Sequence, residues 1–210
     1  MKTDRGSIPA GDEDRARFSG TRAEANRKLL CIGDSNTYGY DPRSYFGSGY
    51  PETVRWTGRL YGWEVLNCGI NGLAVPVDGS VWQNLIEQKN PELITVMLGS
   101  NDLLEGRSAE ETAGRMEAFI RAISRTGKRI LLIAPPAMKT GAWCRSEEQI
   151  RESNKLTHLY RDLADRLGTD FADAEKWNVE ISFDGVHFTE DGHKAFAKGL
   201  QQHLEEKQHE

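Results

Sequence analysis

The sequence has few cysteines and no long apolar run. Its three cysteines, Cys31, Cys68 and Cys144, cannot all pair with one another, and none of them has the Cys-x-x-Cys spacing of a metal site. The longest apolar runs, Leu29–Ile32 and Ile130–Ala134, are far shorter than the ~20 residues that span a bilayer. The N-terminus also lacks the apolar stretch of a secretory signal. We therefore expect a reduced, cytoplasmic protein with no membrane partner.

Charge of one sign is not in strong excess either. The chain has 27 Lys and Arg against 32 Asp and Glu, a net charge of -5, so no general attraction to nucleic acid is expected. Hydrophobic residues make up 38% and charged residues 28%, which is ordinary for a globular protein. A length of 210 residues suits one domain with a sizeable core.

The first 28 residues differ from the rest of the chain. Residues 1–28 are polar, and Met1, Ile8 and Phe18 are their only large apolar side chains. This composition is typical of a flexible arm or leader, and nothing in the sequence separates that reading from an arm that packs on a neighbouring subunit. We expect one folded domain over residues 29–210, and the sequence leaves a homo-oligomer open.

Apolar runs alternate with helical patterns from Lys28 onward. The strand-like runs are Lys28–Ile32, Glu64–Cys68, Leu93–Leu98 and Arg129–Ala134. Helical patterns cover Thr53–Tyr61, Val81–Lys89, Ser108–Arg125, Ser146–Gly168 and Thr189–Lys207. Ser108 and Glu111 form a capping-box signature at the start of one helix. Continuous apolar strands between helices predict an α/β fold with a parallel sheet covered on both faces.

Polar clusters that contain glycine follow three of these predicted strands. They are Gly33–Ser35, Asn67–Gly72 and Gly99–Asp102, and a fourth cluster, Asp184–His187, precedes the last helix. The carboxyl ends of parallel strands lie along one edge of a sheet, where functional groups gather. We therefore expect these clusters to meet.

Together the four clusters contain the groups that acyl transfer needs. The hydroxyl of Ser35 needs a base to become a nucleophile, and an imidazole such as that of His187 is a suitable base near neutral pH. Asp184 can orient the imidazole, and backbone N–H groups or the Asn101 amide can stabilise an oxyanion. Each piece alone is weak, because Gly-Asp-Ser is also a tight turn capped by Asp34. The combination, in this order, favours catalysis.

The same clusters resemble the sequence blocks of the SGNH hydrolases, also called GDSL-type esterases and lipases, over residues 28–206. The matching blocks are Leu30–Thr37, Asn67–Gly72, Gly99–Asp102 and Asp184–Thr189. The resemblance implies Ser35 as nucleophile, His187 as base and Asp184 as the acid that orients it. It also implies an oxyanion hole formed by Ser35, Gly72 and the side chain of Asn101.

The resemblance further implies a three-layer α/β/α sandwich, flavodoxin-like, with no metal and no organic cofactor. One departure is Asn71, which stands where a serine often precedes the glycine of the second block. It affects the side-chain bonding of that loop and leaves the backbone donor of Gly72 unchanged. Val54–Gly58, shortly after Gly39-Tyr40, resembles the arylesterase and acyltransferase branch, whose members act on short acyl esters and form oligomers.

The leading hypothesis is therefore a serine esterase that hydrolyses, or transfers, short acyl groups from small carboxylic esters through an acyl-enzyme on Ser35. An alternative with the same catalytic residues is an O-acetyl carbohydrate deacetylase. A non-catalytic binding module is less consistent with the sequence, because all the catalytic residues are present. An α/β-hydrolase fits less well, since the sequence around Ser35 lacks the second glycine of G-x-S-x-G.

Several other side chains are candidates for the surroundings of the site. Tyr38, Tyr40, Trp56, Trp82 and Trp143 are aromatic residues that could line an acyl or aryl pocket. Residues 135–147 are predicted to form a loop over the site. A metal pair of His193 with Asp184 lacks further ligands, and no cysteine has a histidine partner for a thiol mechanism.

Overall fold

A computed structural model of the chain describes residues 27–44 and 46–207, so all but two residues of the predicted 1–28 arm lie outside the described residues. The described part contains five parallel strands in the order β2-β1-β3-β4-β5. Their bounds are β1 Lys28–Gly33, β2 Glu64–Gly69, β3 Leu93–Met97, β4 Arg129–Ala134 and β5 Asp170–Asp173.

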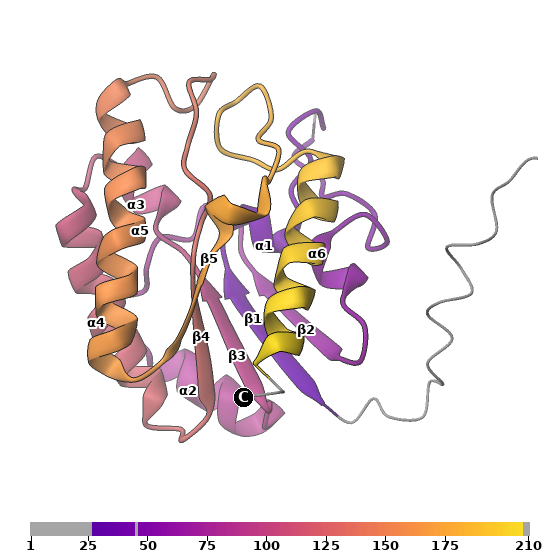
Figure 1. Cartoon of the computed structure of the whole chain (residues 1–210), viewed down its shortest axis with the longest axis vertical. Coiled ribbons are helices and arrows are strands. Elements are labelled where there is room, and N and C mark those ends of the chain that lie inside the picture. Colours follow the sequence, from indigo (N-terminus) through magenta and orange to yellow (C-terminus); the bar gives the residue numbers. More distant parts are fainter. Residues whose placement is uncertain (1–26, 45, 208–210) are drawn as a thin grey trace, which may run out of the picture.

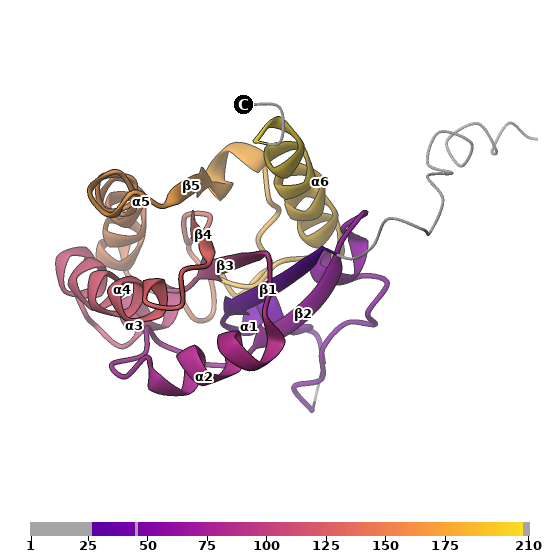
Figure 2. The same ribbon diagram turned by 90° about the horizontal axis from the view of Figure 1, so that it is seen from below.

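Helices cover both faces of this sheet. On one face lie α2 (Ser80–Lys89), α4 (Ala109–Ser124) and α5 (Glu147–Leu167), and on the other lies α6 (Glu190–Glu206) (Figures 1 and 2). The connections contain four short helical elements, α1 (Ser35–Tyr38), η1 (Trp56–Arg59), α3 (Ser100–Leu104) and η2 (Ala174–Trp177). This arrangement confirms the predicted three-layer α/β/α fold.

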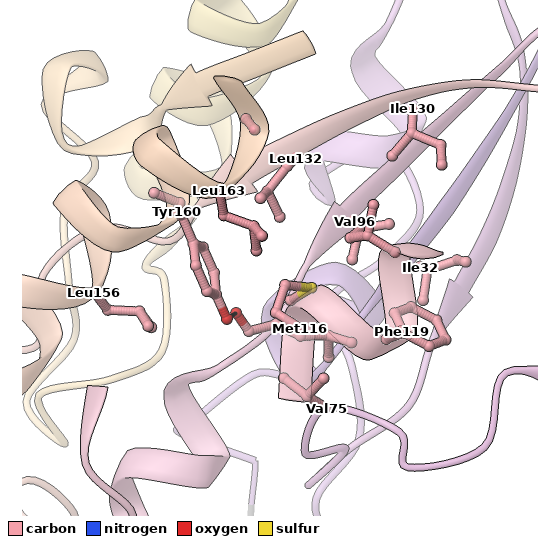
Figure 3. Packing of buried hydrophobic residues seen from close by; sticks show 14 of the residues in the cluster. Ile32, Val75, Val96, Met116, Phe119, Ile130, Leu132, Leu156, Tyr160 and Leu163 are labelled. Atoms are coloured by element: carbon pink, nitrogen blue, oxygen red, sulfur yellow. Dashed lines mark hydrogen bonds between the residues drawn. The ribbon is translucent and has the colours of Figure 1, made fainter. Parts of the chain in front are cut away.

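The central strand β1 packs on both layers, which explains its continuous apolar sequence. Leu30 and Ile32 face the larger hydrophobic cluster, beneath α4 and α5, where Phe119 and Tyr160 are also buried (Figure 3). Leu29 and Cys31 face the opposite cluster. That second cluster contains Phe196 of α6 and Trp56 of η1. Burial on both faces is what a strand in a doubly covered parallel sheet requires.

The register aligns the carboxyl ends of the strands that precede the polar clusters. Gly33 of β1 pairs with Gly69 of β2 on one side and with Met97 of β3 on the other. The chain therefore leaves all three strands at the same level of the sheet. This alignment brings the clusters after β1, β2 and β3 to one edge, as the sequence predicted.

The helix boundaries follow the capping residues. Ser108 and Glu111 form a capping box at the start of α4, and Ser146 and Gln149 form one at the start of α5. Gly168 ends α5 in the left-handed conformation, where glycine pays no Cβ penalty. No helix within residues 27–44 and 46–207 is both long and apolar enough to cross a membrane.

One expectation about secondary structure is wrong, and one strand was missed. The predicted helix Thr53–Tyr61 is only a four-residue 3-10 helix, η1, preceded by turns. A Cβ on Gly58 would lie 2.1 Å from the carbonyl oxygen of Glu52, so a close backbone approach shapes this segment. Strand β5, Asp170–Asp173, was not predicted, because it has only four residues and an aspartate at each end.

Candidate active site

The turn between β1 and α1 holds Ser35 at the edge of the sheet. The Asp34 side chain caps α1 by accepting a hydrogen bond from the backbone N–H of Asn36 at 2.9 Å. The turn is tight, because a Cβ on Gly33 would lie 2.0 Å from Oγ1 of Thr37. Asp34 therefore has the capping role considered for it, and the same turn presents Ser35 at the carboxyl end of β1.

Ser35, His187 and Asp184 form one hydrogen-bonded chain. The Ser35 Oγ lies 2.9 Å from Nε2 of His187, and Nδ1 of His187 lies 2.7 Å from Oδ2 of Asp184. Oδ1 of Asp184 also accepts the backbone N–H groups of Val186 and His187, both at 2.9 Å. The structure thus brings together the three residues that the sequence singled out for nucleophile, base and acid.

The electrostatics of Asp184 suit an ionised carboxylate. Burial opposes its charge, but the hydrogen bonds from the His187 side chain and from the backbone N–H groups of His187 and Val186 outweigh burial and lower its pKa. An ionised Asp184 accepts the Nδ1–H of His187, so Nε2 carries the lone pair that faces the Ser35 hydroxyl. This is the tautomer that a general base needs.

Two aromatic rings cover the imidazole of His187, which is only 1% exposed. The Tyr40 ring centroid lies 4.5 Å away, and the Trp143 ring centroid lies 4.8 Å away, edge to face. Trp143 itself is 52% exposed. These are two of the five aromatic residues proposed for the pocket. The other three lie elsewhere, with Trp56 and Trp82 in the hydrophobic clusters and the Tyr38 ring beneath Arg55.

The loop between β4 and α5 packs against the Asp184 segment. The backbone N–H of Trp143 donates to the Asp184 carbonyl at 2.9 Å, and that of Lys139 donates to the Gly185 carbonyl at 2.9 Å. A Cβ on Gly141 would lie 2.2 Å from the Asp184 carbonyl carbon, so the contact requires glycine. The predicted loop over the site therefore holds Trp143 beside His187.

The loop after β2 is tied to the start of α3. Asn101 donates from Nδ2 to the carbonyl oxygen of Leu73 at 3.1 Å, and Asp102 accepts the backbone N–H of Val75 at 2.8 Å. Gly72 has φ of 74°, a backbone conformation that favours glycine. The loop that follows the second sequence block thus meets the third block, and the Asn101 amide is bonded one residue away from Gly72.

Asn36 is a residue to which sequence reasoning assigned no role. It is 4% exposed, and its side chain contacts the backbone of Val186 and Phe188, on either side of His187. Its backbone carbonyl accepts the indole N–H of Trp56 at 2.9 Å. Only its position next to Ser35 could have drawn attention to it.

The described residues considered for a metal site or a thiol nucleophile have other surroundings. Among residues 27–44 and 46–207, no group of three or more His, Cys, Asp or Glu side chains is placed to hold a metal ion. His193 is buried between Tyr50 and Phe188, and burial lowers its pKa to about 3. Cys31 is buried, and burial raises its pKa to about 12, so its thiol stays protonated.

One protein-family profile matches most of the chain. The profile of the GDSL-like lipase/acylhydrolase family matches residues 31–195, a range that includes all four polar clusters. No curated protein matches the chain in sequence. The family match confirms the resemblance to the SGNH hydrolases that the sequence blocks indicated.

Solved structures with the same fold include arylesterases and acetylesterases. A putative arylesterase from Agrobacterium tumefaciens is 25% identical, with a TM-score of 0.76, over 86% of this chain and 99% of that one. A carbohydrate acetylesterase family member from Sinorhizobium meliloti is 25% identical, with a TM-score of 0.75, over 85% and 97%. The aryl esterase of M. smegmatis is 22% identical, with a TM-score of 0.77, over 86% and 99%, and supports the fold alone.

Proposed function

The chain belongs to the GDSL-like lipase/acylhydrolase family and is a carboxylic ester hydrolase, and we propose that it cleaves short acyl esters through an acyl-enzyme on Ser35. The observation that carries the proposal is the chain of hydrogen bonds from Ser35 Oγ through His187 to Asp184, at 2.9 and 2.7 Å. These hydrogen bonds have the order of donors and acceptors that an activated serine needs.

Acylation begins when the Ser35 Oγ attacks the ester carbonyl carbon. As the new C–O bond forms, the hydroxyl proton passes to Nε2 of His187, and the ionised Asp184 stabilises the imidazolium. The carbonyl oxygen becomes negatively charged, and we assign its stabilisation to the backbone N–H groups of Ser35 and Gly72 and to the Asn101 amide. The bond to the leaving alcohol then breaks, and its oxygen takes the proton from His187.

Deacylation repeats these roles with water. His187 removes a proton from water, whose oxygen attacks the acyl carbon, and the returning proton releases Ser35 and a carboxylic acid. A second alcohol in place of water would yield a new ester, so the same site supports acyl transfer. The ratio of the two products depends on which acceptor reaches the acyl carbon first.

A preference for short acyl chains is part of the proposal. A net charge of -5 offers no attraction to anionic lipid. Acetyl to butyryl esters should therefore react faster than long-chain esters. A preference for palmitoyl esters or for lysophospholipid would contradict this part of the proposal and point to a lipase.

A second candidate is removal of acetyl groups from an O-acetylated sugar. The leaving oxygen must lie near His187 Nε2, and the half-exposed indole of Trp143 stands beside that imidazole. A flat apolar ring can pack against one face of a sugar as well as against an aryl group. Comparing kcat/KM for nitrophenyl acetate and for acetylated xylan would rank the two candidates.

The compartment and the assembly state are also proposals. Cys31, Cys68 and Cys144 are free thiols, and unpaired cysteines fit a reducing compartment. We therefore infer a cytoplasmic enzyme. The resemblance of Val54–Gly58 to oligomeric relatives supports a homo-oligomer, which light scattering of the purified chain would test.

The central experiment concerns Ser35. Ser35→Ala should lower kcat on nitrophenyl acetate by ~10⁴ to 10⁶-fold while the fold stays intact. An organophosphonate should label Ser35, and Ser124→Ala, which changes a serine at the end of α4, should keep full activity. Labelling of another serine, or normal turnover by Ser35→Ala, would remove Ser35 from the proposed role.

A further inference from the structure

The side chain of Asn36 joins the turn that carries Ser35 to the segment that carries His187. Its Nδ2 donates to the carbonyl oxygen of Val186 at 3.1 Å, and its Oδ1 accepts the backbone N–H of Phe188 at 3.0 Å. The two partners are the residues immediately before and after His187. One carboxamide therefore holds the backbone on both sides of the catalytic imidazole.

The orientation of this carboxamide is set by its partners. A carbonyl oxygen can only accept and a backbone N–H can only donate, so the amide nitrogen must face Val186 and the amide oxygen must face Phe188. The backbone of Asn36 is held as well, because its carbonyl oxygen accepts the indole N–H of Trp56 at 2.9 Å. Asn36 is thus fixed relative to the turn while it holds the His187 segment.

The other bonds of the His187 segment do not fix its distance to Ser35. Asp184 accepts from Val186 and His187 within one short segment, so those bonds would move together with the imidazole. Among the described residues, hydrogen bonds between the turn 34–38 and the segment 184–188 come only from Ser35 and Asn36. Asn36 is therefore the residue whose side chain ties this segment directly to the Ser35 turn.

We propose that Asn36 is a positioning residue, which holds His187 Nε2 within hydrogen-bond reach of the Ser35 Oγ by bonding the backbone on both sides of His187. The inference rests on the proposed roles of Ser35 and His187.

Two substitutions separate the bonds from the packing. Asn36→Leu fills the volume and removes both bonds, whereas Asn36→Asp keeps the size and the acceptor for Phe188 but loses the donor to Val186. Because a misplacement of about 1 Å can cost ~10²-fold, we expect kcat to fall roughly 10 to 10²-fold in Asn36→Leu. The loss should be at least as large in Asn36→Asp, because a carboxylate oxygen then faces the Val186 carbonyl oxygen. KM should change little, since Asn36 does not touch the substrate in this scheme.

The measurements are made per folded molecule. Labelling of Ser35 by an organophosphonate should slow in parallel with kcat, and the proton NMR signal of His187 Nδ1–H should broaden or shift. Gln83→Ala is the matched control, because its amide also bonds a backbone carbonyl, that of Ala122, but between α2 and α4. This control should lower the melting temperature without changing the labelling rate.

The outcomes distinguish this inference from the proposed function. A wild-type protein that hydrolyses no ester and is not labelled at Ser35 would overturn the proposed function itself. An active wild-type protein whose Asn36→Leu and Asn36→Asp variants melt earlier, yet are labelled and turn over normally per folded molecule, would overturn the positioning role alone. Slower labelling in both variants, with Gln83→Ala unaffected, supports it.

Discussion

Two regions of the site, the turn before Ser35 and the segment before His187, each contain a buried aspartate, yet the two carboxylates differ. Asp34 and Asp184 are both 2% exposed. Burial raises the pKa of Asp34 to about 6, and only partial compensation comes from the N–H of Asn36. Asp184 accepts from three donors, and its pKa is lowered despite burial. At Asp34 burial outweighs the donors, whereas at Asp184 the donors outweigh burial, so the two pKa values shift in opposite directions.

This difference matches the role of each region. Asp184 must remain ionised to stabilise an imidazolium on His187, and its segment supplies the donors that keep it so. Asp34 caps a short helix, and a cap needs an acceptor oxygen rather than a charge. The predictions below test this division of roles, beginning with the largest expected effect.

Asp184→Asn should lower kcat more than Asp34→Asn does. An asparagine cannot accept the Nδ1–H in the same way, so His187 adopts the wrong tautomer and kcat should fall by ~10⁴-fold. Asp34→Asn keeps an acceptor for the Asn36 N–H, so its kcat should stay within a few-fold of wild type. Steady-state kinetics on both variants make the comparison. Equal decreases in kcat for the two variants would contradict the separate roles assigned to Asp184 and Asp34.

The next prediction concerns a donor that lies outside both regions. The Asn101 amide is assigned to the charge that develops on the carbonyl oxygen, so Asn101→Ala should lower kcat by ~10²–10³-fold with little change in KM. Some stability should also be lost, because the Leu73 carbonyl loses its donor. Turnover and melting temperature are measured on one sample. Normal turnover per folded molecule would reduce Asn101 to a residue that only ties the loop after β2.

A smaller effect is expected from Trp143, which covers the His187 region but not the Asp34 turn. Aromatic contacts contribute about 0.5–1.5 kcal/mol beyond their buried area, so Trp143→Ala should lower kcat/KM for aryl or sugar acetates by roughly 2 to 10-fold. Ethyl acetate, whose alcohol is too small to reach the indole, serves as the control. The same loss on ethyl acetate would indicate that Trp143 supports His187 rather than the leaving group.

The smallest effect on kcat is expected from Asp34→Asn, which should instead change the pH dependence of stability. Asp34 binds its proton more tightly when folded, so its contribution is present below pH ~4 and is lost as pH rises to about 6. The Asp34→Asn variant has no carboxyl group at this position, so it does not lose this stability as the pH rises. Its melting temperature relative to wild type should therefore increase between pH 4 and 6 and then stay constant. The free-energy difference is on the order of 1–3 kcal/mol.

Asp184 gives the opposite sign. Because the pKa of Asp184 is lowered on folding, its ionised form stabilises the fold at pH values above the ordinary aspartate pKa. This stabilisation is lost as the pH falls. Asp184→Asn should thus lose stability relative to wild type at neutral pH and approach it in acid. Thermal melts of both variants across the pH series test the pair of slopes. Parallel slopes would contradict the opposite pKa shifts.

Much of the fold was predictable from local patterns. Continuous apolar runs marked three of the five strands, and the sequence also predicted the strand over Glu64–Cys68. Ser108 and Ser146 marked the starts of two long helices. The helix predicted over Thr53–Tyr61 was wrong, because contacts from Glu52 and Asn36 shape that segment more than its own propensities. Strand β5 was missed, because four residues carry too little pattern and its pairing with β4 decides its structure.

The sequence by itself determined the chemistry available to this protein, since the nucleophile, base and acid are residue types that appear in short blocks. Only the tertiary structure decided how they meet and what holds them. Asn36 bonds residues 150 and 152 positions away, and the Ser35 hydroxyl meets His187 Nε2 across 152 positions. Neither contact has a local signature. Such contacts arise when distant segments pack together, and local sequence carries no record of that packing.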